Sequence, residues 1–200
     1  MMVREVKTKV TNAVLYSDGC IRIDNVRASY PHLDKTYAKS EDGKPEDPKF
    51  SIVAMLEKAT HVAAKDLCVK VIQELAAEKK TKVGKDKWFI KDGDESDKAE
   101  YEGYWTVSAR ESNRPSVRNR KGNVMSEQEI RDIIYAGCRV NVLIRPWYQD
   151  NSYGKRVNAG LVAVQFVRDD EQIGEGRVND DGVFEPIEGD DDGFGDDDSL

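Results

Sequence analysis

Histidine is the scarcest titratable residue in this chain of 200 residues, since only His32 and His61 occur. Neither lies at ligand spacing from a cysteine or from the other histidine, so we expect no zinc site. Two isolated histidines leave no Ser/His/Asp or Cys/His arrangement for nucleophilic catalysis, and no P-loop or GxGxxG motif is present. The sequence therefore argues against an enzyme, and we expect no catalytic residue, metal or cofactor.

Cysteine and long apolar runs are also scarce. Cys20, Cys68 and Cys138 lie far apart, inside apolar runs and without a CxxC partner, so we interpret them as small buried residues of a protein in a reducing compartment. No window approaches the roughly 20 apolar residues of a transmembrane helix. Charged residues stand where a signal peptide needs an apolar stretch. We therefore expect a soluble intracellular protein that makes no membrane contact.

Positive charge is missing from the end of the chain. Residues 169–200 contain one Arg against 14 Asp and Glu, whereas residues 1–168 contain 30 Lys and Arg against 24 Asp and Glu. The formal net charge of −7 thus divides into a body of +6 and a C-terminal part of −13. This asymmetry indicates a polyanionic partner for the body and an interaction or self-screening role for the acidic part, with simple solubilisation as the alternative.

The chain ends in DDDGFGDDDSL, in which six aspartates surround one phenylalanine. Repelling carboxylates without apolar neighbours cannot build a core, so we expect residues 185–200 to form a disordered acidic tail. The preceding residues 1–184 have the length of one domain. The tail residues that we expect to bind a partner are Asp190, Asp191, Asp192, Phe194, Asp196, Asp197 and Asp198.

Strand signals dominate the body. Two β-branched runs flank the Asp18-Gly19 pair and predict a hairpin over residues 10–30, followed by a polar loop over residues 34–48. The segments KFSIVAML and GYWTVSAR have the composition and alternation of strands. Two longer runs, CRVNVLIRPWY and RVNAGLVAVQFVR, predict a second hairpin joined by QDNSYGK.

Two helices are expected between these strands. Thr60 is the predicted N-cap of the main helix, which runs to about Lys80. Ser126 and Glu129 have capping-box spacing for a short helix around residues 127–134. Five or six strands, one main helix and long loops favour a mainly β fold, an OB-fold-like Greek-key barrel, over an alternating α/β sheet. The apolar face predicted for the main helix consists of Ala64, Leu67, Cys68, Val71, Ile72, Leu75 and Ala76.

Arginines and aromatic residues gather in two regions, SARESNRPSVRNRKGN and RPWYQDNSYGKR. Arginine suits bidentate phosphate contacts, and aromatic rings stack on bases, so the mixture is typical of a single-stranded nucleic-acid site with little sequence preference. The candidate DNA-binding residues are Tyr104, Arg110, Arg114, Arg118, Arg120, Lys121, Arg145, Trp147, Tyr148, Tyr153, Lys155 and Arg156.

Each aromatic residue also has an interpretation as part of the core. Strand alternation places Trp105 with apolar neighbours, so Trp105 is expected in the core and Tyr104 on the outer face. The three rings of the second region lie near a hairpin tip, where a role in the core is harder to arrange. Trp88-Phe89 follows five lysines and fits either the binding surface or a cap on the core.

The acidic turn KDGDESD offers a different class of function. Asp92, Asp94 and Ser96 alternate as at the start of a calcium loop, but the expected glycine and glutamate of that motif are absent. Together with Glu100, the two aspartates could hold magnesium in a nuclease or resolvase. They lie in one turn rather than on separate rigid elements, so we favour a solvated turn and a non-catalytic binding protein.

The order of several short motifs resembles a family of phage single-stranded DNA-binding proteins. These motifs are VRASYP, KFSIVAML, KDGDE, YEGYWTVSA, YAGCRVNVLI and YGKRVNAGLVAVQFVRDDEQIG, and together they cover about residues 20–185. The resemblance implies an OB-fold that coats single-stranded DNA in phage replication or recombination, in the cytoplasm of the infected bacterium. Proteins of this class often end in acids and a terminal aromatic residue, whereas Phe194 is internal here. The sequence leaves open whether the protein forms a homodimer.

The resemblance and the charge distribution together suggest a role for the tail. A flexible segment of the 32 residues from 169 to 200 has a root-mean-square span of roughly 30 Å, enough to reach across a small domain. We expect the tail to compete with DNA for the basic surface and, once displaced, to recruit replication or recombination proteins.

Overall fold

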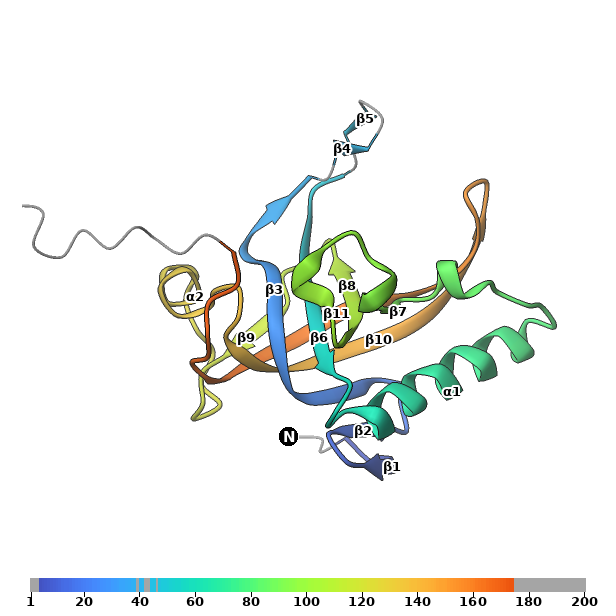
Figure 1. Ribbon diagram of the computed structural model, residues 1–200, viewed down its shortest axis with the longest axis horizontal. Helices are drawn as coiled ribbons and strands as arrows, with labels where there is room; N and C mark the ends of the chain where they lie inside the picture. The colour runs from blue at the N-terminus through green and yellow to red at the C-terminus, as the bar shows by residue number, and fades with distance from the viewer. Residues whose placement is uncertain (1–3, 39, 42–43, 46, 175–200) are drawn as a thin grey trace, which may run out of the picture.

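Strands predominate over helices in this computed structural model, which describes residues 4–38, 40–41, 44–45 and 47–174 (Figure 1). The long strands are β3 (Ile21–Tyr37), β6 (Lys49–Glu57), β8 (Tyr104–Glu111), β10 (Arg139–Asn151) and β11 (Gly154–Arg168). The short strands are β1 (Val6–Val10), β2 (Ala13–Tyr16), β4 (Ser40–Glu41), β5 (Lys44–Pro45), β7 (Ile90–Asp92) and β9 (Ser116–Arg118). The helices are α1 (Val62–Glu78) and α2 (Glu127–Ile133), with short turns η1 (Lys85–Lys87), η2 (Gly93–Glu95) and η3 (Ala99–Tyr101).

The five long strands close into a barrel. Their order is β3-β10-β11-β8-β6, and β6 pairs back to β3. All these pairs are antiparallel except β8 with β11, which is parallel and meets at Arg110 and Gly160. A five-stranded Greek-key barrel of this kind is the OB-fold. The prediction of a mainly β, OB-fold-like barrel is therefore confirmed.

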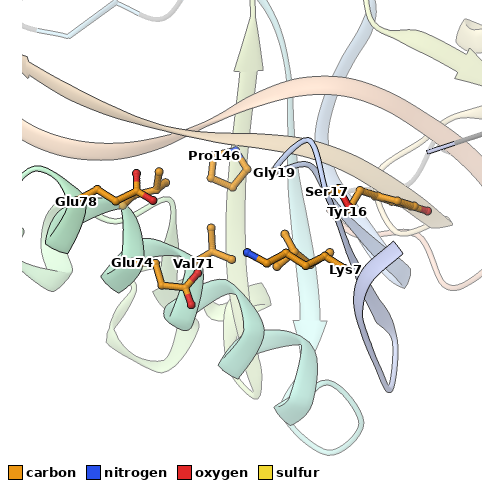
Figure 2. A pocket seen from close by; sticks show the side chains of 10 residues that line it. Lys7, Tyr16, Ser17, Gly19, Val71, Glu74, Glu78 and Pro146 are labelled. Carbon is orange, nitrogen blue, oxygen red and sulfur yellow. The ribbon is translucent and has the colours of Figure 1, made fainter. Parts of the chain in front are cut away.

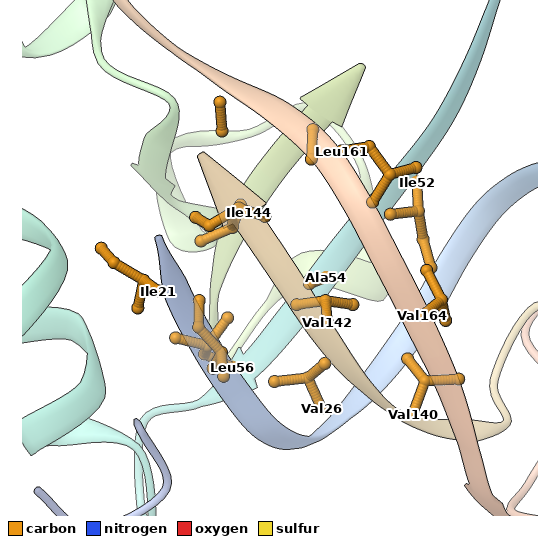
Figure 3. Packing of buried hydrophobic residues seen from close by; sticks show 14 of the residues in the cluster. Ile21, Val26, Ile52, Ala54, Leu56, Val140, Val142, Ile144, Leu161 and Val164 are labelled. Carbon is orange, nitrogen blue, oxygen red and sulfur yellow. The ribbon is translucent and has the colours of Figure 1, made fainter. Parts of the chain in front are cut away.

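The barrel interior is filled by aliphatic side chains, because alternate residues of each strand point inward. Ile52 and Ala54 of β6 oppose Ala109 and Val107 of β8, and each is at most 1% exposed. Figure 3 shows how residues from β3, β6, β10 and β11 meet in this interior. Truncating a large side chain here to alanine is expected to cost about 2–5 kcal/mol of stability.

The main helix buries the predicted face, with only Leu75 left half-buried. Its predicted N-cap is wrong, because the helix begins after His61 and has no side-chain cap. The reason is a tertiary contact: His61 is 1% exposed, and its Nε2 donates to the carbonyl of Asp24 over 2.9 Å. Thr60 instead places its hydroxyl 2.8 Å from Nδ1 of His61.

The second helix follows the sequence more closely. Ser126 and Glu129 form both hydrogen bonds of the predicted capping box. Ile130 and Ile134 bury their side chains in the core, so α2 is joined to the barrel even though the helix is short.

Two predicted loops are partly strand. The polar loop over 34–48 is shortened because β3 continues to Tyr37, which opposes Lys49 of β6. The connection QDNSYGK is likewise shortened, because Gln149–Asn151 pair with Gly154–Arg156 and leave Ser152-Tyr153 as the turn. The strand β1 was not predicted, and the proposed domain boundary at 184/185 lies outside the described residues.

The three cysteines are buried and unpaired, as expected. Burial raises the pKa of the Cys68 thiol to about 12 and that of Cys138 to about 11, so neither thiol ionises near neutral pH. Within the described ranges, no helix has the length and apolar content needed to cross a membrane.

Candidate nucleic-acid interface

The outer surface of β3, β6 and β8, called the front face below, collects polar side chains in a row across the strands. His32 opposes Ser51, Ser51 opposes Arg110, and Arg110 opposes Gly160 of β11. Directly opposed residues point to the same side of a sheet, and neighbouring strands lie about 4.8 Å apart, so the row spans roughly 14 Å. Arg110 thus shares a surface with a residue that the sequence analysis did not select.

Two further rings of β3 lie beside this row, and together with His32 of the row they are called the aromatic arm: Tyr30, His32 and Tyr37. The His32 ring stacks on Tyr37, with ring centroids 4.4 Å apart and planes 8° from parallel. Tyr30 is 48% and Tyr37 52% exposed. From the sequence alone these rings receive no binding role, because Tyr37 falls in the loop predicted over 34–48 and His32 is considered only as a metal ligand. Exposed rings on a strand can stack on bases.

Partial burial lowers the pKa of His32 below its ordinary value of 6.5, against the opposing effect of Asp34. The ring is therefore neutral at pH 7, and the stacking surface it shares with Tyr37 is uncharged. Phosphate binding at this point depends on the neighbouring cations.

Residues 93–103, which contain η2 and η3, cover the end of the front face around Ser29. The hydroxyl of Tyr101 lies 3.3 Å from Ser29 Oγ, and both residues are buried. Lys98 Nζ donates to the Tyr30 hydroxyl over 2.5 Å and lies 3.9 Å from the centre of that ring. The open part of the front face is therefore the part that bears His32, Tyr37 and Arg110.

The β10–β11 hairpin presents its predicted residues on two opposite faces. Trp147 opposes Asn158 and Gln149 opposes Arg156, whereas Tyr148 opposes Val157 on the other face. Trp147 is 46% exposed, but Tyr148 is half-buried and packs against the core. Both rings are candidates from the sequence, and the structure places them on opposite sides of β10, because neighbouring residues of a strand point to opposite sides.

Three further hairpin residues are placed by their neighbours. Tyr153 occupies the turn and is 81% exposed. Lys155 lies on the face of Tyr148 and donates from Nζ to Thr81 Oγ1 over 2.9 Å. Arg145 lies near Asp18, whose pKa is lowered mainly by a hydrogen bond from the backbone of Cys20 and in smaller part by Arg145. Arg145 also opposes Gly160, the β11 residue at the end of the row, so it continues that row onto β10.

The basic residues after β8 differ in how freely they can meet a phosphate. Arg114 lies 3.3 Å from Glu127 of α2, and its guanidinium lies 5.0 Å from the centre of the Phe50 ring. Arg118 donates to the carbonyl of Gly122 over 2.7 Å. Arg120 and Lys121 are exposed, and no carboxylate of the described residues forms an ion pair with them. These last two are the better phosphate ligands.

The two predicted regions lie at opposite ends of β11. Arg118 opposes Gln165, whereas Arg156 stands nine residues nearer the hairpin turn, about 30 Å away along the strand. Arg110 opposes Gly160 between them. Figure 1 shows β9 and the hairpin turn at the two sides of the barrel. A nucleic acid that touches both regions must therefore cross the barrel.

The remaining aromatic predictions are resolved by burial. Trp105 packs against the core, as expected, with Lys58 and Lys65 over its ring. Tyr104 is half-buried on the opposite side of β8, and its hydroxyl accepts a hydrogen bond from Arg27 over 3.4 Å. Phe89 is buried, so for this residue the interpretation as part of the core is confirmed.

The carboxylates of the alternative nuclease hypothesis have structural partners. Lys58 Nζ donates to both Asp92 and Asp94, and Asp94 also accepts from the backbone of Gly103 over 2.7 Å. The bond from Lys58 is the main cause that lowers the pKa of Asp94. Glu100 lies apart, near Tyr30. In the described part of the chain no group of three His, Cys, Asp or Glu residues could hold a metal.

One surface hollow can be set aside. It has a volume of about 140 Å³ and lies between β1, β2 and α1. Figure 2 shows Glu74 and Glu78 of the helix at its edge, facing Lys7. Two carboxylates at the edge of so small a hollow disfavour a phosphate. The predicted tail residues 190–192, 194 and 196–198 lie outside the described residues.

Comparison with known proteins is consistent with this geometry. The family model described as Enterobacter phage Enc34, ssDNA-binding protein, matches residues 20–194. The solved single-stranded DNA-binding protein from bacteriophage Enc34 in complex with ssDNA is 46% identical, with a TM-score of 0.80, over 87% of this chain and all of that chain. The same Enc34 protein in another structure is 44% identical, with a TM-score of 0.79, over 92% of this chain and all of that one.

Two further phage proteins match this chain over a shorter length or at lower identity. Putative protein p50 of Acyrthosiphon pisum secondary endosymbiont phage 1 is 36% identical over 89 residues, which are 44% of this chain and 47% of that protein, so the match spans about half of that relative. The single-stranded DNA-binding protein gp2.5 of bacteriophage T7 is 14% identical, with a TM-score of 0.51, over 80% of this chain and 98% of that one, and shares the fold alone.

Proposed function

The chain belongs to the family of the single-stranded DNA-binding protein of Enterobacter phage Enc34, and from this premise we propose that it binds single-stranded DNA on the front face, between the aromatic arm and the β10–β11 hairpin. The observation that carries this proposal is the row from His32 through Ser51 to Arg110, beside the stacked ring of Tyr37.

The topology supports this path. OB-folds bind oligonucleotides on the face of their second and third strands, together with the loops that join strands one to two and four to five. The corresponding parts here are β6, β8, the connection that follows β3, and the turn between β10 and β11. The aromatic arm leads into the first connection, and Tyr153 stands in the second.

The chemistry divides between cations and rings. Arg110, Arg156 and Lys155 follow the phosphates, and Arg120 with Lys121 extends the basic surface past β9. Tyr37, Trp147 and Tyr153 stack on bases, each stack contributing about 1–3 kcal/mol. Stacking and phosphate contacts carry little sequence information, so the protein binds any single strand of sufficient length. OB-fold sites cover roughly 4–16 nucleotides, and the larger sizes suit a strand that crosses the barrel.

The protein acts by binding, without catalysis, and coats single-stranded DNA during phage replication or recombination. The ion pairs of Lys58 with Asp92 and Asp94 support a structural role for the acidic turn rather than that of a nuclease. The acidic tail competes with DNA for the basic surface and recruits partner proteins when DNA displaces it. The support for this role is the charge of −13 on residues 169–200 beside a body of +6.

A fluorescence titration with oligo-dT of several lengths, and with duplex DNA of equal length, tests the proposal. Tight binding that depends on strandedness is expected, with affinity lost in the double variant Tyr37→Ala, Arg110→Gln. Val62→Ala is the matched control, since Val62 is 49% exposed on α1, away from the front face. Equal affinity of the double variant and the control contradicts the proposed path.

A second assay addresses catalysis. Labelled single-stranded and branched DNA incubated with magnesium is expected to stay uncut. Cleavage that disappears in Asp92→Ala would favour the nuclease.

A further inference from the structure

An apolar hollow of about 480 Å³ lies outside the proposed DNA path, between the C-terminal half of α1 and residues 81–88. Ile72, Ala76 and Trp88 contribute apolar surface to it. The indole of Trp88 is held in place because Nε1 donates to the carbonyl of Val83 over 3.0 Å. Concave apolar surface rimmed by polar residues is typical of a binding site.

The rim of the hollow is basic. The segment from residue 79 to 87 contains five lysines and one acid, Asp86. Lys82 and Lys85 line the hollow, and Lys79, Lys80 and Lys87 stand beside them in the same segment; all but the half-buried Lys87 are exposed. Only Lys87 forms an ion pair within the described residues, with Asp86 over 3.6 Å. An apolar hollow inside a lysine rim fits an aromatic side chain flanked by carboxylates.

The C-terminal segment of the chain has this chemistry. Residues 175–200 contain 11 acids and one Arg, and they include Phe184 and Phe194. Six aspartates stand within four residues of Phe194. We propose that Phe194 inserts into the hollow beside Trp88 and that its flanking aspartates pair with the lysine rim. The proposal rests on the competition between tail and DNA proposed above, and it gives the docking site of the tail.

Chain length selects Phe194 over Phe184. The described chain ends at Gly174, and Ile173 is held there by its backbone bond to Ala136 over 2.9 Å. Figure 1 places this end on the other side of the barrel from the C-terminal end of α1. Arg168 stands six residues before this end, and the path along β11 from Arg168 to Lys155, which touches Thr81 of the hollow, is about 43 Å.

Extended chain spans at most about 3.6 Å per residue. Ten residues to Phe184 therefore reach only about 36 Å, whereas 20 residues to Phe194 reach about 70 Å. Phe194 can therefore reach the hollow of its own chain without full extension of the residues that precede it.

Docking at this site explains competition with DNA without placing the tail on the front face. Thr81 lines the hollow and accepts the hydrogen bond of Lys155. Aspartates docked along the rim lie next to Lys155 and draw it away from phosphate. A strand of DNA that binds the hairpin then removes one attachment of the tail.

The test uses the full chain and the indole NMR signals of its three tryptophans, assigned by Trp→Phe variants. Phe194→Ser keeps every charge and is expected to shift the Trp88 signal, whereas the matched control Phe184→Ser leaves it in place. Lys82→Glu with Lys85→Glu is expected to give the same shift. Lys7→Glu with Lys9→Glu, the same charge change on the exposed strand β1, does not.

The outcomes separate this proposal from the proposed function. The docking site is overturned if Phe194→Ser leaves the Trp88 signal unchanged. If DNA affinity still rises in that case when residues 185–200 are removed, the competition between tail and DNA stands. A Trp88 shift without any change in DNA affinity supports the docking site and overturns the competition. A shift caused by Phe184→Ser alone overturns the assignment of Phe194. A shift that depends on protein concentration overturns docking within one chain in favour of a neighbouring copy.

Discussion

At the scale of single residues, exposed rings should affect DNA binding and leave stability unchanged. Trp147→Ala and Tyr153→Ala each remove a side chain that is largely free of the core. We expect each to weaken binding to oligo-dT by about 1–3 kcal/mol, with little change in the salt dependence, because stacking releases few counterions. Fluorescence titration at several salt concentrations measures both quantities, and the melting temperature should stay within the error of the wild type.

Tyr148→Ala is the internal comparison for these two variants. The Tyr148 ring packs against the core, so its truncation should lower the melting temperature. Were Tyr148→Ala to weaken DNA binding as strongly as Trp147→Ala while keeping full stability, the division of the hairpin into two faces would lose its functional meaning.

His32 should make folding stability depend on pH. Its pKa is lowered by burial, so the folded protein binds this proton less readily than the unfolded chain does. The contribution of neutral His32 to the free energy of unfolding is complete above about pH 6.5. It is lost as the pH falls from there towards the pKa of His32 in the folded protein. Urea unfolding of wild type and His32→Gln between pH 5 and 7.5 measures the effect. The wild type should lose stability more steeply below pH 6.5, and parallel profiles would refute the expectation.

The kinds of residue at the site could be predicted from the sequence, but their faces could not. Arg110, Trp147 and Tyr153 stand out as cations and rings near loops. That Trp147 and Tyr148 diverge follows from strand alternation, but which of the two faces the core depends on how β10 pairs with its neighbours. Tyr37 was missed because the polar residues over 34–48 predict a loop, whereas pairing with β6 keeps both His32 and Tyr37 in a strand.

At the scale of elements, the capping box of α2 has a consequence for stability. Ser126 accepts from the backbone of Glu129 and thereby fixes the start of the helix, whose first residue, Glu127, holds Arg114. Ser126→Ala should destabilise the protein by about 1 kcal/mol. Ser112→Ala, at an exposed loop position, is the control and should be neutral. Urea unfolding compares them, and equal midpoints would show that the cap contributes nothing.

The loop after β8 should contribute unequally to the salt dependence of binding. Each neutralised phosphate on a single strand adds about −0.7 to the slope of log K against log salt. Arg120→Ala and Lys121→Ala should each flatten the slope by about that amount. Arg114→Ala should change it less, because Arg114 already has Glu127 as partner. The measurement is a titration from about 50 to 300 mM salt, and an unchanged slope in the Arg120→Ala, Lys121→Ala pair would remove this loop from the path.

Element boundaries were predictable where the signal is local. Ser126 and Glu129 define a helix start through their own side chains, and the Asp18-Gly19 turn defines a hairpin. Thr60 failed because the start of α1 depends on His61 and its bond to Asp24, a residue 37 positions away in the chain. Local pattern contains no information on such a contact.

At the scale of the whole molecule, closure of the barrel is the step that sequence pattern specifies least. The pairs β3–β10 and β8–β11 join segments far apart in the chain, and local sequence pattern does not predict them; they follow only from the expected OB-fold. Long-range pairing also brings Arg110 to His32 and separates Arg118 from Arg156. The charge asymmetry, in contrast, is visible in the sequence, because it needs no register.

That asymmetry gives the prediction for the complete chain. Removing residues 185–200 deletes eight carboxylates and no cation, so the formal net charge rises from −7 to +1. Affinity for single-stranded DNA should increase, most strongly at low salt. The gain should shrink towards 1 M salt, where the Debye length falls to about 3 Å and the tail no longer meets the basic body. Titrations of both chains across this range measure the gain.

A tail that only solubilises also repels DNA, so a modest gain does not distinguish the two roles. A peptide of residues 185–200, added to the truncated protein, does. Tethering gives the tail a local concentration near the millimolar range, so the free peptide should displace oligo-dT at about millimolar concentration. The same peptide with Phe194→Ser keeps the charge and reports the aromatic contribution. If neither peptide displaces DNA, the tail acts on DNA only by electrostatic repulsion. If the Phe194→Ser peptide displaces DNA more weakly than the unchanged peptide, the ring as well as the carboxylates binds the body.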